Sequence, residues 1–213
     1  MRANTPISAD TVVIVFARAP LAGRVKTRLV PRLGADGAAR LHVRLIRRTV
    51  QLALEARCGA VELHSTAPHA LFRTLRIKIR RQRGRDLGER MHHALREALR
   101  RQRQAIIIGA DAPALTPGDL RRAQRLLRGT DVVLAPAEDG GYALIGARRA
   151  SPRIFADVEW GSARVLAQTV RNVSRAGVSY RLLRTVWDVD RPEDLERLRS
   201  RPLSLAAPQH ARR

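Results

Sequence analysis

Several residue classes are scarce in this chain, and each scarcity excludes something. Cys58 is the single cysteine in 213 residues, so no internal disulfide can form and a reducing, cytoplasmic setting is expected. Aromatic residues make up only 3%, which leaves single-stranded bases few stacking platforms. No apolar run approaches the roughly 20 residues of a membrane span. The longest early run, Val12–Ala17, is also too short for a signal-peptide core.

Lysine is scarce even though the chain is strongly basic. Lysine and arginine total 41 against 19 acidic residues, a net charge of +22, yet only Lys26 and Lys78 are lysines. The arginines are scattered along the chain, so we expect salt-sensitive polyanion binding without specific nucleic-acid recognition. A non-enzymatic nucleic-acid-binding protein is the alternative that this charge leaves open.

Apolar runs alternate with helical patterns along the chain. This alternation predicts a single-domain, Rossmann-like α/β fold with a mixed, mainly parallel sheet and helices on both faces. The predicted domain spans residues 1–200, and residues 201–213 are predicted to be a flexible tail. The expected strands are Thr11–Ala17, Ala60–Ser65, Arg76–Arg80, Ala105–Gly109, Asp131–Ala135, Gly141–Ala147 and Val178–Leu183. The expected helices are Gly34–Arg57, Leu87–Gln102, Pro117–Arg128, Ser162–Arg175 and Pro192–Arg199.

The first strand ends in a glycine-containing basic loop. Within VVIVFARAPLAGRVKTRL the loop carries Arg18, Gly23, Lys26 and Arg28, and a helix follows. A strand, such a loop and a helix in succession commonly hold nucleotide phosphates, so these four residues are predicted to bind a nucleotide. We expect Lys26 to be exposed, so that its loss weakens nucleotide binding and barely changes stability. A solvated turn is the alternative, because Val25 precedes Lys26 where a Walker A motif has glycine.

Two acidic positions are candidates for a metal site. Asp111 follows the strand Ala105–Gly109, and a carboxylate at a strand end is a good ligand for Mg²⁺ or Mn²⁺. Asp188 and Asp190 alternate on one extended segment, and we expect Asp190 to be the better second contact. Turn and helix capping are the structural alternatives for Asp111 and Asp190.

The segment PAEDGGY follows the strand Asp131–Ala135. Glu138 and Asp139 are predicted to be catalytic, as a base or as holders of an acceptor. The next three residues, Gly140, Gly141 and Tyr142, are predicted to contact substrate, because glycine lets a ligand approach the backbone. A hairpin turn is the competing explanation, since Asp-Gly favours one.

A weaker motif, QRGRDLGERM, runs from Gln82 to Met91 and enters a helix. Its backbone, including Gly88, is predicted to contact the base or ribose. Ligands of such sheets sit beyond the carboxyl ends of the strands, so all these clusters are expected at one edge.

Five motifs together resemble a known family. FARAPLAGRVKTRL, QRGRDLGERM, GADAPALT, PAEDGGYALIG and DVDRPEDL are similar to those of the bacterial radical-SAM/selenodomain-associated, or arsenosugar-type, glycosyltransferases. The resemblance implies the GT-A nucleotide-diphospho-sugar transferase fold, with Asp111 as the metal-binding aspartate. This chain departs from the family at Ala110 and Ala112, where threonine and cysteine are common, and at Ala143, where an aromatic often stands.

The basic loop also resembles that of phospholactate guanylyltransferase. The two resemblances imply two reactions: transfer from a nucleotide sugar to a small-molecule acceptor, which we expect, or nucleotidyl transfer from a nucleoside triphosphate. Loop charge suits the triphosphate, whereas the adjacent carboxylates suit sugar hydroxyls.

Overall fold

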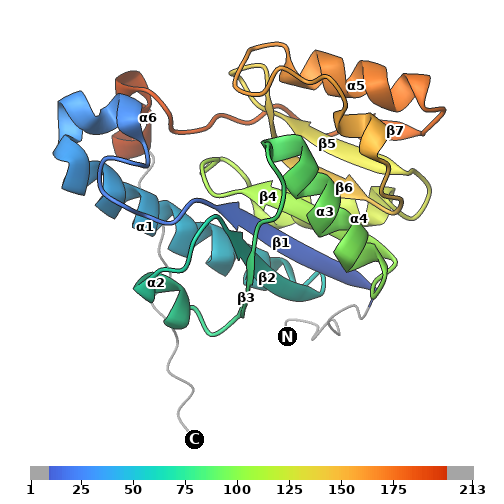
Figure 1. Cartoon of the computed structure of the whole chain (residues 1–213), viewed down its shortest axis with the longest axis horizontal. Helices are drawn as coiled ribbons and strands as arrows, with labels where there is room; N and C mark the ends of the chain where they lie inside the picture. The colour runs from blue at the N-terminus through green and yellow to red at the C-terminus, as the bar shows by residue number, and fades with distance from the viewer. Residues whose placement is uncertain (1–9, 201–213) are drawn as a thin grey trace, which may run out of the picture.

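A computed structural model describes residues 10–200, and a seven-stranded sheet forms its centre (Figure 1). The strand order is β3-β2-β1-β4-β6-β5-β7. The strands are β1 (Thr11–Ala17), β2 (Ala60–Ser65), β3 (Lys78–Arg81), β4 (Gln104–Gly109), β5 (Val132–Pro136), β6 (Tyr142–Ala147) and β7 (Tyr180–Leu182). All neighbouring pairs are parallel except those of β6, which is antiparallel to both β4 and β5. The predicted mixed, mainly parallel sheet is confirmed.

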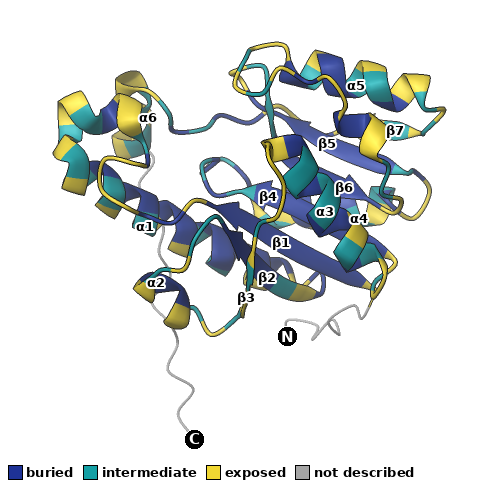
Figure 2. Ribbon diagram, viewed as in Figure 1, coloured by how far each residue is buried: buried dark blue, intermediate teal, exposed yellow. Residues whose placement is uncertain are grey.

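Helices cover both faces of the sheet. They are α1 (Val30–Ala56), α2 (Ala70–Arg73), α3 (Leu87–Leu99), α4 (Pro117–Leu126), α5 (Val165–Arg175) and α6 (Pro192–Ser200), with short 3₁₀ turns η1 (Thr27–Leu29) and η2 (Pro152–Phe155). Successive β1 residues alternate between two cores, as a pleated strand requires. Val13 and Val15 pack in the core under α1 and α4, whereas Ile14 packs in the core under α3 and α5. Figure 2 shows the central strands β1, β4, β5 and β6 almost wholly buried, whereas the edge strands β3 and β7 are largely exposed.

Most predicted boundaries hold to within a few residues. Thr116 caps α4 in a reciprocal capping box with Asp119, with Pro117 at its first position. The strand predicted from Arg76 begins at Lys78, because Arg76 has a left-handed backbone. The helix predicted from Gly34 extends back to Val30, but Gly34 itself interrupts it with a φ of 70°. The helices α2, η1 and η2 are not predicted from the sequence. The proposed tail, 201–213, lies outside the described residues.

The segment 183–191, called the strap below, returns from β7 across the carboxyl edge of the sheet. Val186 bridges Ala137, and the Val189 amide donates to the Asp111 carbonyl at 2.9 Å. Trp187 and Val189 then join a third core with Leu29 of η1 and with residues of α1 and α6. Figure 1 shows α6 beside the start of α1. The strap therefore brings the C-terminal acidic segment to the first basic loop. Within residues 10–200, no helix is long and apolar enough to cross a bilayer.

Candidate active site

Two contiguous cavities open at the carboxyl edge of the sheet. The larger has a volume of about 710 Å³ and lies under the first loop, with Arg18, Lys26, Arg28 and Asp190 in its wall. The smaller has a volume of about 290 Å³ and lies over β4 and β6. Residues shared by both walls are Phe16, Leu87, Gly109, Asp111, Trp160 and Gly161. Because Asp111 is the shared residue with a charge, it stands where ligands of the two cavities would meet.

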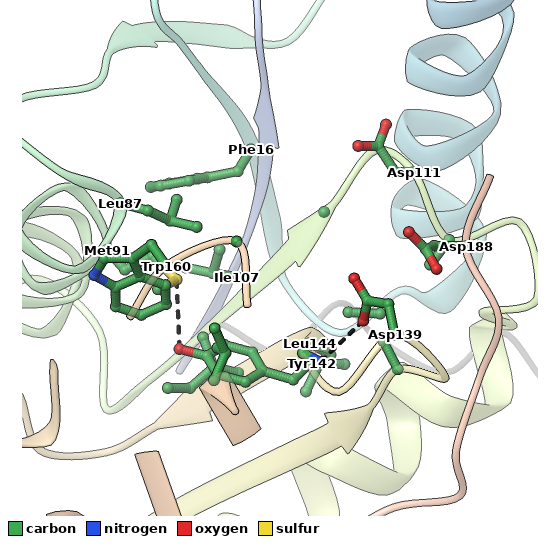
Figure 3. A pocket seen from close by; sticks show the side chains of 18 of the residues that line it. Phe16, Leu87, Met91, Ile107, Asp111, Asp139, Tyr142, Leu144, Trp160 and Asp188 are labelled. Carbon is green, nitrogen blue, oxygen red and sulfur yellow. Dashed lines mark hydrogen bonds between the residues drawn. The ribbon is translucent and has the colours of Figure 1, made fainter. Parts of the chain in front are cut away.

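The smaller cavity has an apolar end and an acidic end (Figure 3). The apolar side chains of Phe16, Met91 and Trp160 gather at one end, whereas Asp111 and Asp188 lie at the other. Asp139 also lines the acidic end, where its Oδ1 accepts a 2.9 Å hydrogen bond from the Gly141 amide. Such a wall can contact the hydrophobic face of a ligand at one end and its hydroxyl groups at the other.

Lys26 contradicts the expectation of an exposed side chain. Its side chain is only 4% exposed, because the ammonium lies 3.0 Å from Asp111 Oδ2 and donates to the Val189 carbonyl at 2.6 Å. Its backbone is left-handed, with a φ of 48°. Lys26 thus ties the first loop to the end of β4 and to the strap, while remaining in the wall of the larger cavity.

The rest of the basic loop is less constrained. Arg28 pairs with Asp190, so both predicted residues are together and partly neutralise each other. Arg18 is exposed and lines the larger cavity. Gly23 has a φ of 71°, the left-handed conformation that glycine adopts at least cost.

His42, on α1, faces Asp111 and was not identified from the sequence. The ring is buried, and its Nε2 lies 3.2 Å from the Arg18 carbonyl oxygen. Its Nδ1 lies 3.7 Å from Asp111 Oδ1, and both atoms are buried without a hydrogen-bond partner. Burial lowers the pKa of His42, although the Asp111 charge and the Arg18 carbonyl oppose this. The neutral ring is therefore the favoured form.

Asp188 lies among other carboxylates. Burial and the charge of Asp139 raise the pKa of Asp188 to about 6; Asp111 and Asp190 add to the rise, and Lys26 opposes it. Mutual repulsion of this kind marks a place where a cation would be stabilised.

Glu138 and Asp139 separate despite being adjacent in sequence. Asp139 faces the smaller cavity, but the Glu138 carboxylate is held by the Arg197 guanidinium in two hydrogen bonds of 2.7 and 3.0 Å. Glu138 lines neither cavity. This pair docks α6 onto the β5–β6 turn, which supports a structural role for Glu138.

Gly140, Gly141 and Tyr142 lie at the turn between β5 and β6, beside the smaller cavity. Gly140 has a φ of 86°, and a Cβ there would lie 2.1 Å from the Ala163 carbonyl oxygen. Both Gly141 and Tyr142 line the smaller cavity. The Tyr142 hydroxyl contacts Met91 Sδ at 4.0 Å, and burial raises its pKa.

Gly88 faces protein rather than either cavity. A Cβ there would lie 2.7 Å from Trp160 Cζ2, so the first turn of α3 packs directly on the indole. Trp160 lines both cavities and, like His42, was missed in the sequence. A lone tryptophan in a loop gives no pattern that distinguishes a cavity wall from a core.

The carboxylate oxygens of Asp111 and Asp190 are suitable ligands for a divalent ion. Among residues 10–200, no group of three histidine, cysteine or acidic side chains has metal-binding spacing. Asp111 nevertheless keeps Oδ1 without a partner while Lys26 occupies Oδ2, and Asp190 lines the same cavity. A single carboxylate or two, completed by ligand phosphates and water, is how Mg²⁺ is usually held.

Comparison with known proteins places these residues in a family. The model described as "Uncharacterized protein conserved in bacteria (DUF2064)" matches residues 44–162. A comparison with curated proteins finds no match. A solved structure named "putative nucleotide-diphospho-sugar transferase", from Desulfovibrio desulfuricans G20, is 30% identical, covers 93% of this chain and 90% of its own, and superposes with a TM-score of 0.85.

Two more distant structures share the fold. CMP:2-keto-3-deoxy-manno-octonic acid synthetase complexed with CTP is 14% identical, covering 90% of this chain and 97% of its own, with a TM-score of 0.60. Rv0371c from Mycobacterium tuberculosis H37Rv, in complex with manganese, is 18% identical, covering 89% and 97%, with a TM-score of 0.57. The predicted sugar-nucleotide transferase type of fold is confirmed.

Proposed function

Because this chain belongs to the DUF2064 family, we propose that it is a nucleotide-dependent transferase that moves a glycosyl group from a nucleotide sugar to a small-molecule acceptor. One observation carries the proposal: a basic-walled cavity and an acid-walled cavity meet at Asp111. The nucleotide would occupy the larger cavity, and the sugar and acceptor the smaller. We also propose that this chain shares its activity with the radical-SAM/selenodomain-associated glycosyltransferases, which its five motifs resemble.

The first loop supports the diphosphate donor over a triphosphate. Lys26 already pairs with Asp111, and Arg28 already pairs with Asp190. Among the ion pairs of residues 10–200, Arg18 is the cation of this loop's predicted set that has no carboxylate partner, and it lines the larger cavity. A nucleoside diphosphate leaving group carries less charge and needs fewer unpaired cations.

The residues divide between binding and proton transfer. Arg18, with Lys26 behind it, would stabilise charge on the departing phosphate. Asp139 would accept the proton of the acceptor hydroxyl, because it is the predicted catalytic carboxylate that faces the smaller cavity. Gly140, Gly141 and Tyr142 would shape the acceptor subsite. The loop that contains Gly23 and the first turn of α3, where Leu87 beside Gly88 lines the larger cavity, would contact the nucleotide.

A divalent ion, Mg²⁺ or Mn²⁺, would be held by Asp111, with Asp190 as the second contact. Asp190 shares the larger cavity with Asp111, whereas Asp188 shares the smaller one, so Asp190 lies on the phosphate side. When bound, such an ion supplies Lewis-acid stabilisation of the phosphate oxygens.

Product analysis tests the proposal. The protein is incubated with Mn²⁺ and a mixture of sugar nucleotides and nucleoside triphosphates, and the products are separated by anion-exchange chromatography. We expect a nucleoside diphosphate and free or transferred sugar, and we expect Asp139→Asn to lose this turnover while Glu138→Gln retains it. Pyrophosphate release with intact sugar nucleotides would instead assign nucleotidyl transfer. If neither sugar nucleotides nor nucleoside triphosphates are consumed, the proposal is overturned.

A further inference from the structure

The His42–Asp111 pair leaves two hydrogen-bond acceptors facing each other. The Arg18 carbonyl oxygen can only accept, so the contact at 3.2 Å requires His42 Nε2 to carry the hydrogen. In the neutral ring, Nδ1 then presents its lone pair. That lone pair faces Asp111 Oδ1 across 3.7 Å, and neither atom has another partner.

Such a pair is costly as it stands. A buried polar atom without a partner has lost its hydrogen bonds to water and gained none in return, and here two electron-rich atoms also repel each other. A cation between them removes both penalties. Metal bonds to imidazole nitrogen and carboxylate oxygen are about 2.1 Å long, so two of them can span the 3.7 Å separation.

The surroundings hold the pair in place. Lys26 fixes Asp111 through Oδ2 and leaves Oδ1 turned toward the ring. The buried side chain of His42 is anchored at its other nitrogen by Arg18. Metal-binding histidines usually have their second ring nitrogen held by a hydrogen bond to a carbonyl or carboxylate, and His42 meets that condition.

We infer that His42 Nδ1 is a metal ligand beside Asp111 Oδ1, and that this nitrogen makes the site prefer Mn²⁺ and similar transition ions over Mg²⁺. The inference rests on the proposed metal-assisted function and adds to it the identity of a ligand and of the ion. Imidazole is a better ligand for transition ions, whereas Mg²⁺ prefers oxygen alone. The larger cavity, which His42 lines, leaves the remaining positions open to water and phosphate.

Pulsed electron paramagnetic resonance with Mn²⁺ alone as the probe tests this ligand directly. Wild-type protein should show hyperfine coupling to a directly bound ¹⁴N, and labelling with ¹⁵N-histidine should convert it to ¹⁵N coupling. This measurement needs no substitution. His42→Gln should abolish the coupling, whereas His92→Gln, on α3 and lining neither cavity, should leave it intact.

Metal affinities measured by calorimetry give a second readout. His42→Gln should raise the Kd for Mn²⁺ at least tenfold and that for Mg²⁺ less than threefold. Asp111→Asn should weaken both ions. Mn²⁺ binding that depends on Asp111 but shows no nitrogen coupling would overturn the His42 inference and leave the proposed metal-assisted function standing. Coupling that survives His42→Gln would also overturn the inference. If wild-type protein binds neither ion, the proposed metal use fails as well.

Discussion

The Lys26 ammonium is held by two partners although the residue lies in a loop. Its ammonium contacts Asp111 and the Val189 carbonyl, and its side chain is nearly sealed from solvent. Removing it would leave the Val189 carbonyl and one Asp111 oxygen without their charged partner. Hydrogen bonds to charged groups contribute roughly 1.5–3 kcal/mol.

We therefore expect Lys26→Met to lower the free energy of unfolding by about 2 kcal/mol and to weaken nucleotide binding as well. Urea denaturation and calorimetry measure the two effects. Lys78→Met is the matched control: its side chain is 57% exposed and its contact with Glu62 is 4.0 Å long. That control should change stability by less than about 0.5 kcal/mol. An unchanged urea midpoint for Lys26→Met would contradict the described contacts.

The sequence predicts which residues lie near the site better than it predicts which of their side chains contact one another. Lys26, Asp111 and Asp190 were all expected near the site because each follows or precedes a regular element, and all line the larger cavity. The Lys26–Asp111 pair joins residues 85 apart, and nothing in local pattern specifies that approach. His42 lies in the amphipathic helix α1. The helical pattern does not distinguish a histidine that faces a site from any other polar residue of the helix.

At the scale of elements, the packing of α3 on the η2–α5 connection sets the shape of both cavities. Gly88 lets the first turn of α3 touch Trp160, and a Cβ at that position would also come within 3.0 Å of Phe155 Cβ. Gly88→Ala should lower the free energy of unfolding by about 1–3 kcal/mol and weaken ligand binding, because Trp160 must shift. Gly129→Ala, where a Cβ meets nothing within 4 Å, is the control. Thermal unfolding of both variants measures the effect, and equal midpoints would refute this packing.

A buried carboxylate ties β2 to β3 and to the chain that follows α3. Glu62 contacts His64 and Arg80, and Arg101 donates to it at 3.1 Å. Burial favours the neutral acid, but hydrogen bonds from His64 and Arg101 and the arginine charges prevail, and they lower the pKa of Glu62 from 4.5 to about 2. The folded state therefore gains stability from the ionised group above the unfolded pKa.

That gain should disappear as pH falls from about 4.5 toward 2. At pH 7 we expect Glu62→Gln to lower the free energy of unfolding by roughly 3 kcal/mol, because the buried side chain loses the charge that pairs with Arg80 and Arg101. Urea denaturation at a series of pH values should show the difference from wild type shrinking below pH 4.5. A difference that stays constant down to pH 2 would argue against a depressed Glu62 pKa.

Secondary structure was predictable where local chemistry decides it. The start of α4 follows from Thr116 and Pro117, and the central strands follow from runs of buried apolar residues. Boundaries failed where a single backbone angle decides, as at Arg76 before β3. The four-residue helix α2 carries too few positions for a periodic pattern.

For the whole molecule, the net charge of +22 has a consequence separate from the site. We expect binding to two unrelated DNA duplexes with equal affinity, falling steeply as salt concentration rises, because phosphate contacts release counterions without reading sequence. Fluorescence anisotropy across a sodium chloride series measures this. Tight binding to one duplex that persists at high salt would favour the nucleic-acid-binding alternative.

The strap also joins two other segments that build the site. Lys26 donates to the Val189 carbonyl, and the Val189 amide donates to the Asp111 carbonyl, so one strap residue is held by both other segments. The amide can exchange with solvent only when the strap leaves the end of β4, and that movement also takes the Val189 carbonyl away from Lys26. Hydrogen exchange of the Val189 amide therefore reports on how often the strap separates from the end of β4. A residue outside both cavity walls thus reports on the contacts that hold the first loop, the end of β4 and the strap together.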